Sequence, residues 1–325
     1  MANSKRVFVT GGAGFIGSNL VGELISRGYE TTVYDNLSVG KLEFINDFVN
    51  NGKCRFIKAD VLNLAMLIES IKGHDAVFHL AANSDIAKGE KITDTDLKEG
   101  TVATYNVLEA MRQNGVEDIV FSSSGAIYGD AGTISTDENY GPLLPISLYG
   151  ASKLASEGLM TAFSHNYGIN VWMFRFANVV GDNSTHGVVH DFVDRLIADP
   201  GTLKILGDGR QTKPYIYVKD CVSGILFGYE KSHERVNFFN LGTSGATSVT
   251  RIADIVVEEM GLSNVKYNYT GGDRGWKSDI PQVRFNISKM SRLGWSAARN
   301  SDESVRTAAK IIIQQRIRRH DAPMR

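Results

Sequence analysis

Tyr149 and Lys153 are the two residues whose types and spacing point most directly to chemistry. They lie four residues apart at the start of a helical apolar pattern, so both project from one helix face. An ammonium group beside a phenol favours the phenolate and lowers a pKa that is ordinarily about 10. The pair therefore predicts a general acid and base that works near neutral pH. Such pairs also occur by chance on exposed helices. Whether this pair is catalytic must therefore be judged from the sequence elements around it.

A strand, a glycine turn and a helix open the chain. The β-branched and aromatic residues 6–10 predict a buried strand. Gly11 permits a tight turn, Gly14 lets a diphosphate approach the backbone, and Gly17 lets helix and strand pack closely. The N-terminus of the helix offers free N–H groups to phosphates, and this order predicts a dinucleotide site. The first helical residues expected at the phosphates are Phe15 and Ile16.

A second strand, 31–34, ends at Asp35, roughly 20 residues after the glycines. Its carboxylate would accept hydrogen bonds from the adenosine ribose diol and repel a 2′-phosphate, which favours NAD over NADP. Asp60 could accept from the adenine amino group, although an ordinary surface aspartate fits the local sequence equally well. Further cofactor contacts are expected from Asn36, Ser38, Gly40, Asp60, Val61, Leu80, Ala81, Ala82, Ser122, Tyr149, Lys153 and Phe176.

Strand and helix patterns alternate as far as Phe176, which predicts an α/β fold with a doubly wound parallel sheet of Rossmann type. Beyond that residue the segments are shorter and richer in glycine. We therefore expect a Rossmann domain at 1–177 and a smaller mixed substrate lobe at 178–325. A segment at about 215–243 is expected to return to the first domain through two strands, 215–218 and 236–241.

Composition excludes several classes of protein. The 325 residues are 42% hydrophobic with a net charge of −1, so nothing attracts the chain to nucleic acid or an anionic membrane. No apolar run reaches the length of about 18 residues that a membrane span needs, and the first residues are no secretion signal. Cys54 and Cys221 are expected in the core, without a disulfide or a metal site. A soluble cytoplasmic protein is the resulting expectation.

Taken together in this order, the motifs resemble those of the extended short-chain dehydrogenases/reductases. More narrowly, they resemble the nucleotide-sugar epimerases of the UDP-glucose 4-epimerase type, over nearly the whole chain. The segments that carry the resemblance are 11–17, Asp35, Asp60, 79–82, 122–124, 149–153, 175–178, 206–209 and 215–220.

The resemblance implies roles for individual residues. Tyr149 would take the proton of the sugar 4-hydroxyl, Lys153 would bind the nicotinamide ribose and keep Tyr149 deprotonated, and Ser124 would assist the proton transfer. A tightly bound NAD would be regenerated in each turnover through a 4-keto intermediate, inverting C4 of a UDP-hexose. The resemblance places the substrate-binding residues at Ser84, Ser124, Asn178, Val189, Lys213, Arg274 and Asp279.

The residues after Ser124 bear on the type of reaction. Related dehydratases resemble one another in an Asp-Glu pair there, and decarboxylases in a glutamate, whereas this chain has Gly125 and Ala126. Two positions depart from the family pattern, because Gly100 replaces an asparagine and Lys213 replaces an arginine that grips the diphosphate. UDP-N-acetylhexosamine or uronate 4-epimerase, decarboxylase and 4-keto reductase activities stay open. So does a catalytically silent NAD-binding regulator.

Several smaller expectations complete the analysis. Val283 falls where the resemblance places the residue whose bulk admits or excludes an N-acetyl group, although ordinary strand packing explains a valine equally well. Family members dimerise through two helices, here 95–114 and 149–167, so a homodimer is expected. Structural roles are expected for the remaining candidates. His79 should be a strand-end histidine with its hydrogen bonds satisfied, His186 and His190 should lie in a loop, and Trp276 and Trp295 should be packing residues.

Overall fold

The computed structural model describes residues 4–276 and 279–321. The chain divides into two compact units, each built from separate stretches of sequence. Unit 1 comprises Met1–Gly129, Glu138–Phe176 and Ile225–Asn240, and unit 2 comprises Asp130–Asp137, Ala177–Gly224 and Leu241–Arg325. The segment that returns to unit 1 is thus 225–240, shorter than the expected 215–243. Residues 130–137, which were expected in the first domain, belong to unit 2.

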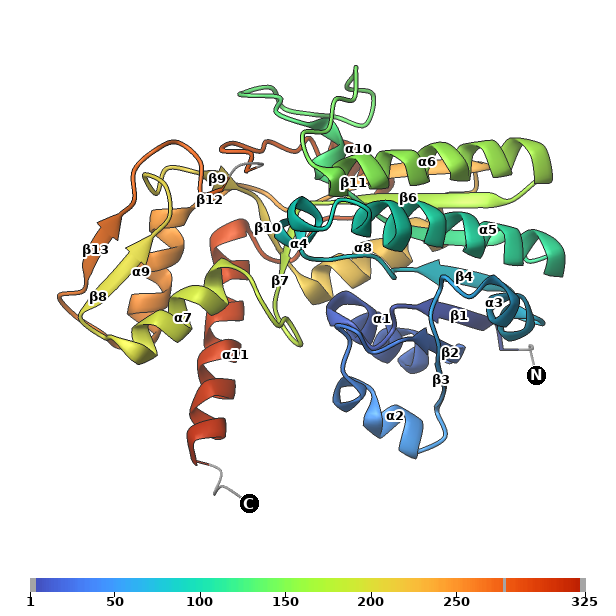
Figure 1. Ribbon diagram of the computed structural model, residues 1–325, viewed down its shortest axis with the longest axis horizontal. Helices are drawn as coiled ribbons and strands as arrows, with labels where there is room; N and C mark the ends of the chain where they lie inside the picture. Colours follow the sequence, from blue (N-terminus) through green and yellow to red (C-terminus); the bar gives the residue numbers. More distant parts are fainter. Residues whose placement is uncertain (1–3, 277–278, 322–325) are drawn as a thin grey trace. The chain divides into compact units, whose positions relative to one another are not determined.

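A seven-stranded sheet forms the centre of unit 1, in the order β11-β6-β5-β4-β1-β2-β3 (Figure 1). Its strands are β1 (Arg6–Thr10), β2 (Glu30–Asp35), β3 (Cys54–Lys58), β4 (Ala76–His79), β5 (Asp118–Ser124), β6 (Asn170–Phe176) and β11 (Val236–Leu241). Strands β1 to β6 pair in parallel. Strand order reverses between β1 and β4, and in such sheets ligands bind beyond the carboxyl ends of the strands at that point.

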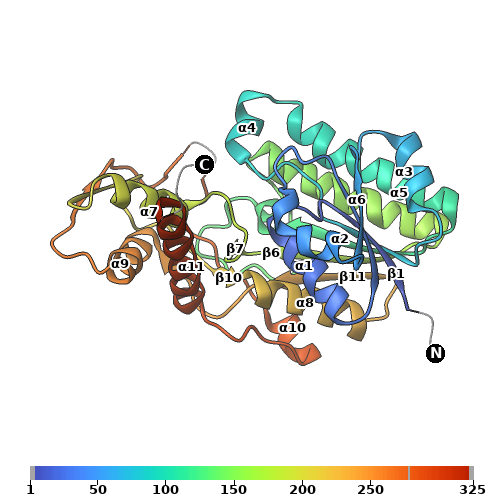
Figure 2. The same ribbon diagram turned by 90° about the horizontal axis from the view of Figure 1, so that it is seen from below.

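Helices cover both faces of this sheet (Figures 1 and 2). One face packs against α3 (Leu64–Ile71), α5 (Ala103–Asn114) and α6 (Leu148–Tyr167), which share a hydrophobic core with the strands. On the other face, α1 (Phe15–Ser26) is joined to α8 (Val218–Lys231) by an Arg27–Glu230 ion pair of 2.8 Å. The shorter helices are α2 (Asn46–Asn50) and α4 (Ile86–Lys91), and short 3-10 turns lie at Leu42–Phe44 and Gly125–Tyr128. The predicted doubly wound α/β fold is confirmed.

The predicted helix 95–114 begins with a π-helical turn, Leu97–Val102, before α5 continues it. Gly100 lies in this turn, where a Cβ atom would come within 2.7 Å of the Ser152 hydroxyl oxygen on α6. Glycine at this position therefore lets the π-helical turn lie directly against α6. Such turns are frequent at functional sites.

Unit 2 is a mixed assembly of short strands and helices around its own core. Strand β7 (Asn178–Val180) pairs with β10 (Tyr215–Tyr217), β8 (Thr202–Ile205) with β13 (Lys266–Tyr269), and β9 (Thr212–Lys213) with β12 (Thr247–Ser248). The helices are α7 (Val188–Ala198), α9 (Val249–Glu259), α10 (Ser288–Leu293) and α11 (Ser301–Asp321). The prediction that 215–218 returns to the first domain is wrong, because β10 pairs with β7 within unit 2. The partner strand of so short an apolar run cannot be predicted from the sequence pattern.

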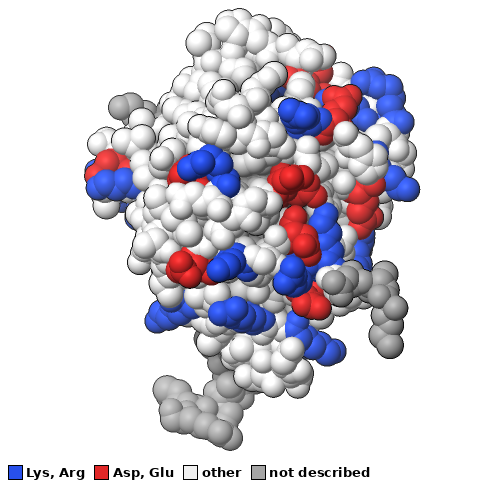
Figure 3. Space-filling view, turned by 90° about the vertical axis from the view of Figure 1, so that its right-hand side faces the viewer, with Lys and Arg blue, Asp and Glu red and all other residues white. Residues whose placement is uncertain are grey.

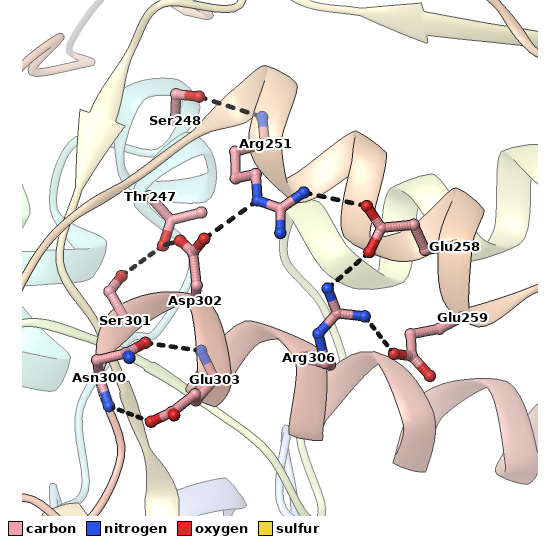
Figure 4. Close-up of polar contacts among 10 residues, drawn as sticks. All are labelled: Thr247, Ser248, Arg251, Glu258, Glu259, Asn300, Ser301, Asp302, Glu303 and Arg306. Atoms are coloured by element: carbon pink, nitrogen blue, oxygen red, sulfur yellow. Dashed lines mark hydrogen bonds and ion pairs between the residues drawn. The ribbon is translucent and has the colours of Figure 1, made fainter.

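Charged residues join α9 to α11 in unit 2 (Figure 4). Arg251 contacts Asp302 and Glu258, each at 3.1 Å, and Arg306 contacts Glu258 at 2.6 Å. Asn300 and Glu303 bond reciprocally, side chain to backbone N–H, at 3.0 and 2.9 Å. This capping box starts α11 at Ser301.

On the face drawn in Figure 3, basic and acidic side chains alternate, and neither sign forms a broad patch. Among the residues that the structure describes, no helix combines the length and the apolar character that a bilayer crossing requires.

Candidate active site

The start of α6 fixes the position of Tyr149 and Lys153. Ser147 caps the helix, and its side-chain oxygen accepts a 3.0 Å hydrogen bond from the N–H of Gly150. A Cβ atom at Gly150 would lie 2.6 Å from the carbonyl oxygen of Ala126, so only glycine fits there. The first turn of α6 is thereby held against the turn that follows β5.

Ser124 lies at the end of β5, and its side chain comes within hydrogen-bond reach of the Tyr149 phenol. Its Oγ accepts a 3.2 Å bond from the N–H of Ala126, which leaves the hydroxyl proton to point toward the phenol oxygen. Burial raises the pKa of Tyr149, and the bond with Ser124 lowers it in part. An oriented donor at the phenol oxygen stabilises the phenolate, as the acid/base role requires.

Lys153 lies one helical turn after Tyr149 and is almost completely buried. Its Nζ donates a 2.7 Å hydrogen bond to the Ser122 carbonyl oxygen and lies 5.8 Å from the centroid of the Tyr149 ring. Burial lowers the pKa of Lys153 to about 8. The prediction that the lysine lowers the pKa of Tyr149 is wrong, because burial of the phenol dominates and raises it. Sequence spacing indicates proximity but not the loss of water around both groups.

The glycine turn after β1 has the tight geometry that its sequence predicted. Gly11 has φ +69°, and a Cβ atom there would lie 2.7 Å from the backbone nitrogen of Ala81 after β4. A Cβ atom at Gly17 would lie 2.1 Å from the carbonyl oxygen of Gly11. Gly14 precedes α1 as its N-cap without a side-chain cap, so Phe15 and Ile16 begin a helix with uncapped N–H groups. Such an N-terminus is a site for a diphosphate.

Asp35 ends β2 beside this turn. Its carboxylate oxygens accept hydrogen bonds from the N–H groups of Ala13 at 3.0 Å and Leu37 at 2.8 Å. Burial raises the pKa of Asp35, and these two N–H donors partly offset the rise. A Cβ atom at Gly40 would lie 3.0 Å from both carboxylate oxygens, so glycine there leaves space around the acid.

The loop after β2 meets the end of β3. The Asn36 side-chain N–H group donates to Asp60 at 2.9 Å, and the backbone N–H of Ser38 donates to the side-chain oxygen Oδ1 of Asn36 at 2.9 Å. The other Asp60 oxygen accepts from the N–H of Leu62 at 2.8 Å. These bonds suit an ordinary surface aspartate as well as an adenine contact. The neighbouring Val61 is partly buried.

The residues after β4 stand at the same edge of the sheet as the glycine turn. Leu80, Ala81 and Ala82 are partly buried there, Ser84 is exposed, and Phe176 ends β6. His79 bonds Thr10 at 2.7 Å through Nδ1 and Thr104 at 3.2 Å through Nε2. The prediction of a satisfied strand-end histidine is confirmed.

Unit 2 brings together predicted substrate residues that lie far apart in the sequence. Lys213 forms an ion pair of 2.5 Å with Asp279, which is 2% exposed. Arg274 donates to the carbonyl oxygen of Asp279 at 2.6 Å and pairs with Asp130 at 2.7 Å. The ammonium group of Lys213 also lies 4.8 Å from the centroid of the Trp276 ring. Trp276 is 47% exposed, so the prediction that it is a packing residue is wrong, whereas Trp295 is buried as expected.

Two other predicted substrate residues lie in different surroundings. Asn178 is exposed on β7 and bonds the buried Tyr215 through its side chain. Val189 is buried in the core of unit 2, where its side chain is used for packing. The expected loop around His190 is wrong, since His190 lies inside α7 and bonds Ser184 at 2.8 Å.

With this geometry established, comparison with known proteins decides the family. The model of the NAD dependent epimerase/dehydratase family matches residues 7–242. The chain belongs to this family. The members of this family depend on NAD, the cofactor predicted from Asp35 and the glycine turn. The protein is therefore an NAD-dependent member of the extended short-chain dehydrogenase/reductase type.

Relatives within the epimerase/dehydratase family act on nucleotide sugars. A putative UDP-glucose 4-epimerase of Methanocaldococcus jannaschii is 32% identical over 92% of this chain and 96% of its own length. A crystal structure of a UDP-galactose 4-epimerase is 36% identical, covers 95% of this chain and 99% of its own, and has a TM-score of 0.85. A UDP-N-acetylglucosamine 4-epimerase from Methanobrevibacter ruminantium is 28% identical, with coverage of 96% and 99% and a TM-score of 0.86.

The residues of unit 1 fit the family's cofactor. The glycine turn would collide with Ala81 or with itself if Gly11 or Gly17 carried a Cβ atom. It therefore brings the uncapped N-terminus of α1 to the carboxyl edge of the sheet, where a dinucleotide diphosphate is bound. Asp35 adds a carboxylate for the ribose diol.

The sequence analysis missed two residues of this family member. Trp276 contacts Lys213 only through the fold, and Asp96 is a buried carboxylate that no sequence motif singled out. A tryptophan beside phosphate-type residues was the available signal for the first. Within the described part of the chain, no group of three or more His, Cys, Asp or Glu side chains could hold a metal ion.

Proposed function

We propose that the protein is an NAD-dependent nucleotide-sugar 4-epimerase that interconverts UDP-glucose and UDP-galactose. The observation that carries the proposal is the grouping of three side chains: Ser124 comes within hydrogen-bond reach of the Tyr149 phenol, and the Lys153 ammonium group lies 5.8 Å from the centroid of the phenol ring. This arrangement holds a phenol between a hydroxyl donor and a buried cation. It suits removal of a proton from a sugar hydroxyl and return of that proton later.

In this proposal Tyr149 accepts the proton of the 4-hydroxyl as a carbonyl forms at C4. It donates the proton back after the keto sugar has rotated to present its other face. Ser124 donates to the same oxygen and stabilises the phenolate. Lys153, fixed on Ser122, supplies a positive charge and binds the nicotinamide ribose. Bound NAD supplies the acceptor and donor of hydride, so the reaction is redox-neutral overall. The N-terminus of α1 and Asp35 hold the cofactor.

The residues after Ser124 favour epimerisation over elimination or decarboxylation. Gly125 and Ala126 begin a 3-10 turn and carry no group able to transfer a proton. Inversion at C4 needs no acid or base besides Tyr149, since a single phenol serves both directions. Dehydration would need a further proton-transferring pair.

For the UDP part of the substrate, we assign the diphosphate to Lys213 and Arg274 and the uridine ribose to Asp279. Lysine neutralises phosphate as a point charge, while arginine binds through a planar fork. The polar contacts within this group hold all three side chains at one place in unit 2.

A second substrate class, the UDP-N-acetylhexosamines, is favoured by Val283. Its N–H donates to the Thr212 carbonyl oxygen at 3.1 Å, which places it beside the strand that carries Lys213. A valine leaves more space than a tyrosine for an N-acetyl group. Turnover of UDP-glucose without turnover of UDP-N-acetylglucosamine would exclude this extension.

We further propose a homodimer and a cytoplasmic location. The π-helical turn, α5 and α6 expose large apolar side chains, as a helix-bundle interface requires. These side chains are Leu97, Val102, Tyr105 and Tyr167. Cys54 and Cys221 are both buried free thiols, which suits a reducing compartment.

The test is incubation of the purified protein with UDP-galactose, without added NAD, while NMR follows the sugar protons. Appearance of UDP-glucose would support both the reaction and a retained cofactor. Absence of conversion of UDP-galactose after NAD is supplied would defeat the glucose/galactose assignment. UDP-N-acetylglucosamine and UDP-glucuronate would then be tried, and failure on all three would contradict 4-epimerisation of a UDP-hexose.

A further inference from the structure

A carboxylate without a full set of partners is buried close to the catalytic helix. Asp96 is 2% exposed, and its Oδ1 accepts a 2.9 Å hydrogen bond from the side-chain amide of Asn83. Its Oδ2 is buried and has no hydrogen-bond partner among the described residues. A Cβ atom at Gly89 on α4 would lie 2.0 Å from this oxygen, so the glycine makes room for it. Leaving a buried carboxylate oxygen unpaired is costly, so it needs an explanation.

The segment that carries Asp96 is held against α6. Asp96 directly precedes the π-helical turn, in which Gly100 approaches Ser152 as closely as a residue without Cβ can. Ser152 is the neighbour of Lys153 in the sequence. One turn further along α6, Ser156 bonds Thr104 of α5 at 3.0 Å. The π-helical turn that follows Asp96 is therefore packed against α6, the helix that carries Tyr149 and Lys153.

The charges around Lys153 show which anion offsets its buried ammonium group. Asp96 and Glu157 both act on Lys153 in the direction that keeps it protonated. Glu157 is already neutralised, since Arg175 binds both of its oxygens at 3.0 and 2.8 Å. Asp96, by contrast, has only the neutral Asn83 amide as a direct partner. Burial raises the pKa of Asp96, and the bond from Asn83 and the positive charge of Lys153 act against that rise. The charge of Asp96 is therefore the one not already matched by a paired cation.

The other titratable groups near these residues leave that conclusion unchanged. Lys88 on α4 faces Asp96 but pairs with Glu99 at 3.1 Å, and both are well exposed. Burial lowers the pKa of His79 to about 3, so its ring near Lys153 is neutral. The interaction with Ser124 lowers the pKa of Tyr149, and the negative charge of Asp96 raises it.

We propose that Asp96 is the buried counter-charge that keeps Lys153 an ammonium ion, and so acts through Lys153 as a positioning residue of the active site. This role rests on the catalytic function proposed for Tyr149 and Lys153. The same negative charge opposes ionisation of Tyr149, so Asp96 sets the pH range of the pair. Removing the charge makes both groups lose their protons at lower pH, because a nearby negative charge favours the protonated form of each.

The test replaces Asp96 by asparagine, which has the same shape and no charge. The pH profile of turnover of Asp96→Asn should move to lower pH by about 0.5 unit or more, a factor of about three in the ionised fraction. The matched control is Asp94→Asn, because Asp94 pairs with Lys98 on the exposed side of the same segment. Its profile should stay in place.

A second measurement does not depend on turnover. Carbon-13 NMR of labelled lysine follows the ionisation of Lys153, assigned by the loss of its signal in Lys153→Met. A lower titration midpoint in Asp96→Asn supports the proposal even if no UDP-sugar is converted, which would defeat only the proposed function. An unchanged midpoint in a folded Asp96→Asn protein overturns it. Asp96→Glu should restore the midpoint and the profile toward the native values.

Asp96→Ser is the second neutral variant and should shift the midpoint in the same direction. Circular dichroism and thermal melting establish that each variant is folded. If neither neutral variant folds, Asp96 is a structural residue and the proposal is overturned.

Discussion

The ammonium group of Lys153 donates a 2.7 Å hydrogen bond to the carbonyl oxygen of Ser122. This bond ties α6 to the carboxyl end of β5, two residues before Ser124. The three candidate catalytic residues are therefore carried by two rigid elements that are joined at the site itself. Sites built in this way hold their geometry without help from loops.

Replacing Tyr149 by phenylalanine should lower turnover by about 10²-fold or more, because the general acid/base group is lost while the ring remains. Bound NAD, measured after denaturation of the protein, should be retained. Tyr167→Phe is the matched control, since Tyr167 lies at the other end of α6 and is 55% exposed. Native turnover in Tyr149→Phe would refute the mechanism.

Gly17→Ala should weaken NAD binding at least tenfold and lower the melting temperature. The added Cβ would lie 2.1 Å from the Gly11 carbonyl oxygen, so the glycine turn has to move away from α1. Overpacking of this kind costs about 1–3 kcal/mol. In the control Gly22→Ala on the same helix, the Cβ would lie 3.3 Å from the ring of Phe48, which is a side chain and can shift. Equal NAD affinity of both variants would contradict this account of the turn.

Folding stability should fall as the pH drops from 7 to 5. The pKa of His79 is about 3 in the folded protein, below its unfolded value, so the unfolded chain binds more protons in this range. The contribution of His79 is complete above about pH 6.5, and about 2 kcal/mol of it is lost at pH 5. Thermal melting at both pH values measures the loss.

His79→Gln should flatten this pH dependence, because the amide can still reach a hydroxyl group and does not titrate. His233, which is exposed, provides the control His233→Gln, whose melting temperatures should show the native slope. Equal slopes in all three proteins would remove His79 as the cause.

Lys213→Met should weaken the binding of UDP by about tenfold, or about 1.4 kcal/mol, in isothermal titration calorimetry. The variant removes the charge assigned to the diphosphate and leaves Asp279 buried without its lysine. Lys219→Met is the control, because the side chain of Lys219 is 66% exposed. Unchanged UDP affinity would mean that Lys213 does not bind the diphosphate and only forms its ion pair with Asp279.

Tyr105→Glu should shift the protein toward the monomer in analytical ultracentrifugation at micromolar concentration. Tyr105 is 43% exposed on α5, and a carboxylate there would have to be buried in a helix-bundle interface. Tyr269→Glu introduces the same change at a tyrosine that is 44% exposed in unit 2 and should leave the mass unchanged. A native protein that is already monomeric would defeat the dimer proposal.

Local patterns were sufficient for much of unit 1. The expected strands 6–10 and 236–241 have the observed bounds, because β-branched and aromatic runs bounded by turn residues act over a few neighbours. The glycine turn and the spacing of Tyr149 and Lys153 are equally local. A nucleotide site and an acid/base pair could therefore be predicted from the amino-acid sequence alone.

Tertiary structure decided what depends on distant residues or on burial. Lys213 meets Asp279 across 66 positions, and β10 pairs with β7 rather than with the large sheet. The pKa of Tyr149 is raised because packing removes water from around the phenol, an effect that no spacing encodes. No motif distinguishes Asp96 from other aspartates in the sequence, and only the fold buries it beside Asn83 and Gly89. Electrostatic properties follow from such enclosure, so they appear only once the chain has folded.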